Sequence, residues 1–351
     1  MINNYLELYK VQKLPIYQNR MYDSENEARA CPKGDVCLVE NLETGLVYNT
    51  AFCPELMVYD AHYQNEQAVS SLFLEHLKSV AKIVGRSMGL DGLVEVGCGK
   101  GYFLEMLLSQ GFDIIGFDPA YEGTNARIER CYFKPGMGIK AANIILRHVL
   151  EHIQDPVNFL MHLREANGGS GLIYIEVPCF NWICSHRAYF DVFYEHVNYF
   201  RLADFYRIFG RVIEAGRLFG GQYLYIVADL TSLKIPQYDM QHPVNFPEDF
   251  LHCFEELRRT EHITIWGGAS KGVILALLKE YAGTPVKTVI DINPAKQGKF
   301  LPATGLKVQS PAEALQNFPL GGIIYIMNSN YRKEIKEMTG NIFNLMCIDH
   351  E

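Results

Sequence analysis

Residues 93–108, LVEVGCGKGYFLEMLL, contain the features that decide the fold. The apolar start of this stretch predicts a buried strand and its second half predicts an amphipathic helix, with Gly97, Gly99 and Gly101 between them. Glycine is needed in such a turn because the backbone takes positive φ angles there and because a ligand approaches it closely. The stretch therefore predicts the first strand, turn and helix of a nucleotide-binding α/β domain, although a plain strand-to-helix turn would also use glycine.

Two acidic residues favour the ligand-binding reading of this turn. Glu95 lies near the end of the first strand, and Asp118 ends the next strand about 20 residues after the turn. An acid at the second position can accept hydrogen bonds from ribose hydroxyls. We therefore expect an adenosine-containing ligand.

Apolar runs on either side of this stretch alternate with helical patterns, as parallel βαβ units require. We expect a domain at 67–230 that begins with an amphipathic helix at 67–88 and ends with a hairpin at 211–229. Its parallel strands are expected at 93–96, 113–117, 143–146 and 171–177.

A proline-rich linker is expected at 231–246, followed by a second α/β series at 247–351. Its strands are expected at 262–266, 288–292 and 322–327, with helices near 248–260, from 271, and near 311–316. Residues 1–66 show no sustained periodicity and are expected to form a small irregular lobe of short strands and loops. The predicted fold class is therefore α/β, with two tandem Rossmann-like doubly wound domains and this N-terminal lobe.

Composition excludes several classes of function. The chain has 351 residues with 40 acidic and 32 basic side chains, so its formal charge of −8 argues against a nucleic-acid partner. No window approaches the roughly 20 apolar residues of a membrane span, and no secretory signal is visible. Nine cysteines without any C-x-x-C pair fit reduced thiols, so a soluble cytoplasmic protein is expected.

The pattern E-x-G-x-G-x-G resembles motif I of class I S-adenosylmethionine-dependent methyltransferases. A dinucleotide fingerprint would need a glycine where this sequence has Tyr102. The segment HVLEHIQDPVNFL at 148–160 resembles the motif after strand four of the same superfamily. This resemblance implies S-adenosylmethionine as cofactor, with His148 and Glu151 lining its pocket beside the two acids and three glycines described above.

Three further segments resemble sugar C-methyltransferases, which act on nucleotide-linked 4-keto deoxysugars. They are FYEHVNYF at 193–200, FGGQYLYIV at 219–227, and WGGASKG at 266–272 with IDINPAKQGKFLPATGLKV at 290–308. The resemblance implies a methyltransferase core between a zinc-binding N-terminal lobe and a C-terminal Rossmann-like lobe. It also implies a nucleotide sugar as the small-molecule substrate, bound between the lobes.

The same resemblance suggests roles for side chains. Methylation next to a ketone needs a base for the carbon-bound proton and donors for the enolate oxygen. His196 matches the family's base, Glu195 would hold its ring, Tyr199 is a possible hydroxyl donor, and Tyr63 resembles the tyrosine of the family's lid. Tyr194 occupies a position where the family has histidine, and it is a candidate substrate-binding residue.

The glycine turn of the second series is the candidate site for the substrate's diphosphate. Amides at a helix start favour anions, and Lys271 could add a charge. The candidate residues are Gly268, Ser270, Lys271 and Asp291, together with Gly221 of FGGQYLYIV. The alternative is a structural half-copy whose glycines only permit close packing.

No metal is expected. The family's zinc knuckle is replaced by a segment that includes Asn41 and Thr44, and Cys31, Cys37 and Cys53 have no paired spacing. The spacing H-x-x-E-H at 148–152 invites a metal reading but would need further ligands. Two alternative functions stay open, an O- or N-methyltransferase on a related small polar substrate and a non-catalytic binding module.

Overall fold

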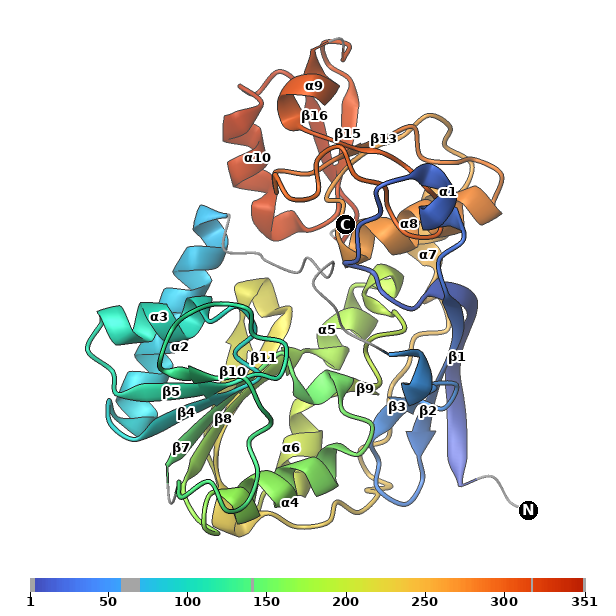
Figure 1. Cartoon of the computed structure of the whole chain (residues 1–351). Helices are drawn as coiled ribbons and strands as arrows, with labels where there is room; N and C mark the ends of the chain where they lie inside the picture. Colours follow the sequence, from blue (N-terminus) through green and yellow to red (C-terminus); the bar gives the residue numbers. More distant parts are fainter. Residues whose placement is uncertain (1–3, 58–69, 140–141, 317, 350–351) are drawn as a thin grey trace.

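The computed structural model describes residues 4–57, 70–139, 142–316 and 318–349. Three sheets make up the molecule: a seven-stranded sheet in the middle of the chain, a five-stranded sheet near the C-terminus and a four-stranded sheet that begins near the N-terminus (Figure 1). All nine cysteines are free thiols. Among the described residues, no helix is long and apolar enough to cross a membrane.

The seven-stranded sheet has the order β10-β11-β8-β7-β4-β5-β6. Its strands from β4 to β8 are parallel, and the antiparallel hairpin β10–β11 joins the edge of β8. This arrangement confirms the predicted doubly wound core and its closing hairpin. The strands are β4 (Leu93–Val96), β5 (Ile114–Phe117), β6 (Ile128–Glu129), β7 (Asn143–Arg147), β8 (Leu172–Pro178), β10 (Val212–Leu218) and β11 (Tyr223–Asp229).

Helices cover both faces of this sheet. Successive side chains along β7 point to opposite faces and show which helices lie on each. Ile145 packs with α2 and α3, whereas Ile144 and Leu146 pack with α4 on the opposite face. Both faces are therefore buried, which is why the strands read as continuous apolar runs. The helices around this sheet are α2 (Ser71–Met88), α3 (Tyr102–Ser109), α4 (Pro156–Ala166), α5 (Phe180–Ser185) and α6 (Leu202–Ile208).

The five-stranded sheet is parallel throughout, in the order β14-β13-β12-β15-β16. This confirms a second Rossmann-like unit, and it adds β14, β16 and α10 to the predicted elements. The strands are β12 (Thr264–Trp266), β13 (Thr288–Ile290), β14 (Val308–Gln309), β15 (Ile323–Ile326) and β16 (Asn344–Cys347). The helices are α7 (His252–Leu257), α8 (Ser270–Tyr281), α9 (Pro311–Leu315) and α10 (Arg332–Met338).

The expectation of an irregular N-terminal lobe was wrong, because that lobe is built on a regular antiparallel sheet. Its strands are β1 (Tyr5–Pro15), β2 (Lys33–Asn41), β3 (Val47–Asn49) and β9 (Asn198–Tyr199), and α1 (Glu25–Arg29) follows β1. The last strand comes from the middle of the chain and pairs with β3. The segment around His196 is therefore fastened to the N-terminal sheet.

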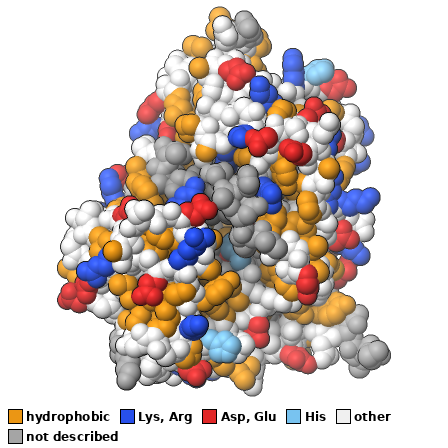
Figure 2. Space-filling view, viewed as in Figure 1, with side chains coloured by type: hydrophobic (Ala, Val, Ile, Leu, Met, Phe, Trp, Pro, Cys, Tyr) orange, Lys and Arg blue, Asp and Glu red, His pale blue; other side chains and the backbone are white. Residues whose placement is uncertain are grey.

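The N-terminal lobe also contacts the C-terminal unit. Asn19 Nδ2 donates to Ser270 Oγ at 3.0 Å, and Arg29 lies 3.2 Å from a carboxylate oxygen of Glu280. On the face shown in Figure 2, basic and acidic side chains are interspersed. The three units thus enclose a common interior rather than forming separate bodies.

Candidate active site

The glycine turn after β4 has the conformation that only glycine adopts easily. The φ angles of Gly97, Gly99 and Gly101 are 74°, 56° and 81°. A Cβ on Gly97 would lie 2.4 Å from Val149, and one on Gly101 would lie 2.4 Å from Ile128, so these two glycines are required by packing. A Cβ on Gly99 would meet no atom within 4 Å. The turn is therefore open at Gly99, where a ligand could approach the backbone.

Asp118 and Glu95, the two acids beside this turn, differ in their hydrogen bonding. The Gly99 amide donates to Asp118 Oδ2 at 2.8 Å, so the acid that ends β5 is attached to the turn itself. Glu95 is buried, and its Oε2 has no hydrogen-bond partner in the described structure. Burial raises the pKa of Glu95 to about 8, against the opposing effect of Arg147. An orphaned acid beside an open glycine turn fits a polar ligand that donates hydrogen bonds there, as S-adenosylmethionine does.

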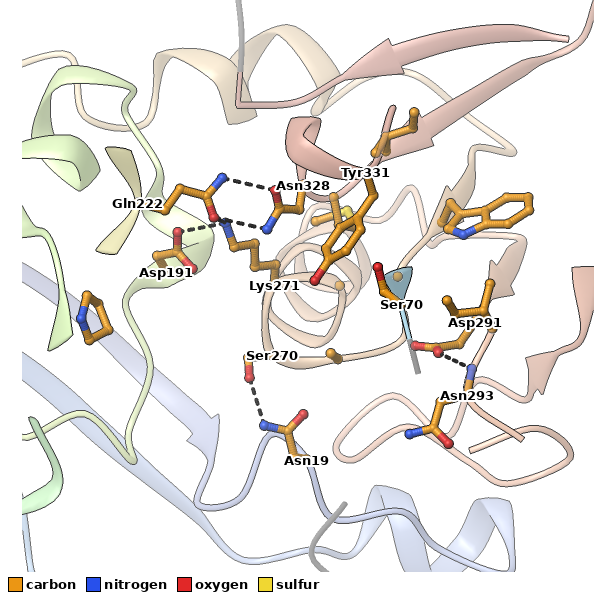
Figure 3. Close-up of a pocket in the computed structure, with 18 of the residues that line it drawn as sticks. Asn19, Ser70, Asp191, Gln222, Ser270, Lys271, Asp291, Asn293, Asn328 and Tyr331 are labelled. Carbon is orange, nitrogen blue, oxygen red and sulfur yellow. Dashed lines mark hydrogen bonds and ion pairs between the residues drawn. The ribbon is translucent and has the colours of Figure 1, made fainter. Parts of the chain in front are cut away.

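A cavity of about 280 Å³ lies where the seven-stranded sheet, the five-stranded sheet and the N-terminal lobe meet. His148 follows β7 and Pro178 ends β8, while Gly267 follows β12 and Asp291 follows β13, and all four line it. The carboxyl ends of both sheets therefore open onto one space, the usual position of ligand sites in open α/β sheets. Asn19 adds a lining side chain from the N-terminal lobe (Figure 3).

His196 lines this cavity and is 9% exposed. Its ring centroid lies 4.0 Å from that of Phe193 and 5.0 Å from that of His152. Burial, together with the charges of His152 and His148, holds the pKa of His196 well below its usual range, so the imidazole is neutral. Its Nδ1 is buried without a hydrogen-bond partner in the described structure.

His148 also lines the cavity, and it is positively charged whereas His196 is neutral. Its Nδ1 is 3.3 Å from Glu151 Oε1 and its Nε2 is 3.1 Å from Glu176 Oε1. Burial alone would lower the pKa of His148, but these two carboxylates outweigh it and raise the pKa to about 9. The φ angle of His148 is 50°, an uncommon conformation that places the side chain between the two acids.

Lys271, at the start of α8, also lines the cavity and is held by several groups (Figure 3). Its Nζ lies 3.0 Å from Asp191 Oδ2 and 3.2 Å from Gln222 Oε1, and it stands over the ring of Trp182 at 5.0 Å. Gln222 and Asn328 exchange two hydrogen bonds of 3.0 and 2.9 Å between the two sheets. The charge is therefore positioned before any ligand arrives.

The second glycine turn repeats one feature of the first. The Gly268 amide donates to Asp291 Oδ2 at 2.9 Å, as the Gly99 amide does to Asp118. A Cβ on Gly268 would lie 3.3 Å from Val289, so this glycine allows close packing and is less open than Gly99. Gly267 and Ser270, on either side of it, line the cavity.

Three predicted site residues are engaged in hydrogen bonds within the protein. The Tyr199 hydroxyl accepts from the Phe193 amide and donates to the Phe193 carbonyl oxygen, at 3.2 Å each. The Tyr194 hydroxyl accepts from the Cys53 amide at 2.8 Å, and Glu195 Oε2 accepts from the Gln18 amide at 3.0 Å. Their expected roles in the site stay predictions.

Two other candidates are not among the described residues that line the cavity. A Cβ on Gly221 would lie 3.3 Å from Trp182, so this glycine serves packing, and its neighbour Gln222 is the lining residue. Tyr63 lies outside the described residues, and its expected lid role stays a prediction. The cysteines expected to bind no zinc, Cys31, Cys37 and Cys53, belong to no metal-sized cluster within the described ranges.

Asn19, His152, Asp191 and Asn328 were missed by the sequence reasoning although they line the cavity. His152 could have been found, because it lies in the quoted segment HVLEH. The others follow no motif and reach the site only through the packing of distant segments.

Comparison with known proteins assigns the two α/β units. Residues 62–212 match a family model described as a methyltransferase domain, and residues 241–345 match one described as a C-methyltransferase C-terminal domain. The chain is 22% identical over 323 residues to the C-methyltransferase NovU of Streptomyces niveus, which covers 78% of this chain and 76% of that protein.

Solved structures that resemble part of the chain include two methyltransferases. One is a SAM dependent methyltransferase from Aquifex aeolicus, with 14% identity over 46% of this chain and 94% of that chain and a TM-score of 0.33. The other is the 1,6-didemethyltoxoflavin-N1-methyltransferase of Burkholderia thailandensis, with 14% identity over 52% and 95% of the two chains and a TM-score of 0.36. The two family-model matches and the relative NovU together indicate that the chain is an S-adenosylmethionine-dependent methyltransferase whose C-terminal unit is similar to the C-terminal domain of C-methyltransferases.

Proposed function

We propose that this enzyme methylates a carbon next to the ketone of a nucleotide-linked sugar. The observation that carries the proposal is the cavity itself, which is lined by a neutral, buried histidine and by a fixed lysine beside a helix start. A keto sugar attached to a diphosphate calls for both features. In this proposal the domain at 67–230 binds the cofactor and the domain at 247–351 receives the nucleotide part.

His196 is the base in this mechanism. The carbon-bound proton moves to its Nε2, and the electron pair of that bond forms the enolate. The enolate carbon would then take the methyl group as the bond from that group to the sulfonium sulfur breaks, with its electron pair staying on the sulfur of the demethylated cofactor. His148 keeps a positive charge beside the cavity, because Glu151 and Glu176 raise its pKa to about 9. Since both of its ring nitrogens are bonded to these carboxylates, it would favour the enolate through its charge and not by donating a hydrogen bond.

The cofactor belongs at the first glycine turn. When bound, S-adenosylmethionine supplies an electrophilic methyl group on a sulfonium. The turn of Gly97, Gly99 and Gly101 gives it an open backbone surface at Gly99, while Asp118 offers a carboxylate and the protonated Glu95 a neutral carboxyl group to its polar groups. Glu151, on the loop after β7, lines the cavity into which the methyl group would be delivered.

The substrate's diphosphate would lie in the cavity near Lys271 and the start of α8. Asp191 now neutralises this lysine, so a diphosphate must compete with a carboxylate for it. Ser270 and Asn293, with their neutral polar side chains, line the cavity next to it. This competition predicts that binding of the nucleotide weakens as ionic strength rises.

The test has two arms. Incubation with S-adenosylmethionine and a panel of keto-sugar nucleotides should give a product heavier by one methylene. In the second arm, the enzyme and substrate are placed in deuterated water without cofactor, and exchange at the carbon next to the ketone is followed. His196→Asn should slow this exchange about 100- to 10,000-fold, because a positioned base contributes that much.

The matched control is His242→Asn, since His242 is exposed in the linker and paired with Asp239. It should exchange at the wild-type rate. If His196→Asn exchanges as fast as this control while it still binds S-adenosylmethionine, another group is the base. Methyl transfer only to oxygen or nitrogen acceptors would replace the proposed substrate class.

A further inference from the structure

Lys296 lies in the loop after β13 and lines the cavity, yet the proposed mechanism gives it no task. This lysine is 4% exposed. Among the described residues, its ammonium group takes part in no hydrogen bond and no ion pair. Since an ammonium group loses its hydration when it is buried, one left without a partner in a cavity indicates that an anionic group binds there.

Lys279 shows how a buried lysine is satisfied in the same unit. It is 0% exposed, and its ammonium group donates to three main-chain carbonyl oxygens at and after the end of α7, those of Leu257, Arg258 and Thr260, at 2.7, 3.3 and 2.6 Å. An ammonium group has three donors, and all three are used there. Lys271 is satisfied in another way, by its ion pair with Asp191. Lys296 differs from both lysines, because its charge is not met by a protein group.

The loop that carries Lys296 is fixed by its main chain. The Lys296 amide donates to the Asn293 carbonyl oxygen at 3.0 Å, and the Gly298 amide donates to the Val308 carbonyl oxygen at 2.8 Å. The start of the lysine side chain is therefore held at the cavity wall before a ligand binds. Such preorganisation lowers the entropy cost of binding.

Asp291 acts on Lys296 through its charge, without an ion pair between the two in the described structure. Both oxygens of Asp291 accept from main-chain amides, Oδ2 from Gly268 at 2.9 Å and Oδ1 from Asn293 at 2.8 Å. Burial lowers the pKa of Lys296, and the charge of Asp291 opposes this effect. A bound anion would add to the effect of Asp291 and favour the charged form of the lysine.

The surroundings of this lysine suit a nucleotide. Figure 3 shows Lys271 and Asp191 on one side of Ser270, and Asp291 on the other. The cavity wall also includes apolar and aromatic side chains of the C-terminal unit, namely Trp266, Ile292, Ile326, Tyr331 and Ile335. Such a lining with a few polar or charged groups is usual for a small-molecule site and gives a flat ring an apolar surface.

We propose that Lys296 binds a phosphoryl group of the substrate's nucleoside diphosphate, as a second cation besides Lys271. The identity of this ligand rests on the proposed function. A phosphoryl group at Lys271 has to compete with Asp191, whereas one at Lys296 gives a buried charge its partner. Removal of the Lys296 charge should therefore weaken binding of the diphosphate without destabilising the free protein.

The experiment is isothermal titration calorimetry of the full-length protein with UDP, dTDP, CDP, GDP and ADP, and with inorganic pyrophosphate. The diphosphate that binds the wild type most tightly is then titrated into Lys296→Met, which removes the charge and keeps a long, unbranched side chain. Its affinity should fall at least tenfold, or about 1.4 kcal/mol. S-adenosylmethionine affinity should stay unchanged, because that ligand belongs at the first glycine turn.

Lys299→Met is the matched control. Lys299 is on the same loop, but its side chain is 43% exposed and pairs with Asp23. This variant should bind the diphosphate as the wild type does. Thermal unfolding without ligand is the second measurement. Lys296→Met should be at least as stable as the wild type, because an apolar side chain replaces a buried charge without a partner.

Wild-type affinity for the diphosphate in Lys296→Met, or no binding of any nucleoside diphosphate to the wild type, would overturn the inference. An equal loss in Lys299→Met would overturn it too, as would pyrophosphate binding as tightly as every nucleoside diphosphate. Diphosphate binding that depends on Lys296, without methylation of any keto-sugar nucleotide, would count against the proposed function alone. Methylation with a wild-type KM in Lys296→Met would count against this inference alone.

Discussion

Substitution of Gly99 separates a ligand effect from a folding effect. Gly99 has a φ angle of 56°, and a Cβ there would meet no protein atom within 4 Å. Gly99→Val therefore costs only backbone strain, about 1–2 kcal/mol, in the free protein. If the cofactor lies against this turn, the valine side chain occupies its place, and S-adenosylmethionine affinity should fall by more than tenfold, or about 1.4 kcal/mol.

Gly111→Val is the matched control for strain. Gly111 has a φ angle of 86° and equally open surroundings, but it follows α3 at the end away from the turn. Both variants should lose similar thermal stability, and only Gly99→Val should lose cofactor affinity. Gly97→Val should behave differently from both, because its Cβ would lie 2.4 Å from Val149 and the fold itself would suffer.

Isothermal titration calorimetry with S-adenosylmethionine and S-adenosylhomocysteine measures the affinities, and thermal unfolding measures the strain. A folded Gly99→Val variant that binds both ligands like the wild type would refute the cofactor position. Equal losses of affinity in Gly99→Val and Gly111→Val would refute it as well, because strain alone would then explain the result.

Three further predictions follow from single contacts. Since burial raises the pKa of Glu95 to about 8 from an ordinary 4.5, the folded protein holds a proton that the unfolded chain releases, so stability falls as pH rises through this window. Relative to Glu95→Gln, the free energy of unfolding of the wild type should fall by up to about 1.4 kcal/mol per pH unit in this window. Urea unfolding at several pH values measures this free energy, and the same pH dependence in both proteins would contradict the prediction. Lys271→Ala should raise the KM for the nucleotide sugar without changing S-adenosylmethionine affinity. An unchanged KM would show that Lys271 only forms its ion pair with Asp191 and does not bind the substrate. Tyr194→Phe should lower the free energy of unfolding by about 1 kcal/mol, through its lost bond to Cys53, while kcat/KM stays within twofold.

The sequence predicted the parts of the fold that are buried on both faces. β4, β7 and β8 are almost wholly buried, so their apolar runs stand out from the flanking residues. β16 was missed because its side chains alternate between exposed and half-buried at the sheet edge, which leaves little contrast. β1 was missed because register shifts after Glu7 and Val11 break its alternation.

The site was predictable only where a motif fixes local geometry. The glycine turn and its acid, Asp118, are set by one βα unit and the strand after it, so their spacing is visible in the sequence. Asp191 reaches Lys271 across 80 positions, and Asn19 reaches Ser270 across 251. No periodicity connects such residues, because their meeting depends on how whole units pack.

The two glycine turns show that similar turn chemistry does not give a similar ligand site. Each donates an amide to the acid at the end of the next strand, at 2.8 Å for Gly99 and 2.9 Å for Gly268. Gly99 is open, whereas Gly268 lies close to Val289, and a Cβ on Gly272 would lie 1.9 Å from the Gly267 carbonyl oxygen. The backbone of the second turn is therefore covered by the start of its own helix. An anion there would have to be held by side chains such as Lys271 and not by an exposed glycine backbone. A bulky residue at Gly268 would thus disturb packing before it disturbed binding, which makes Lys271 the informative position for testing the nucleotide end of the site.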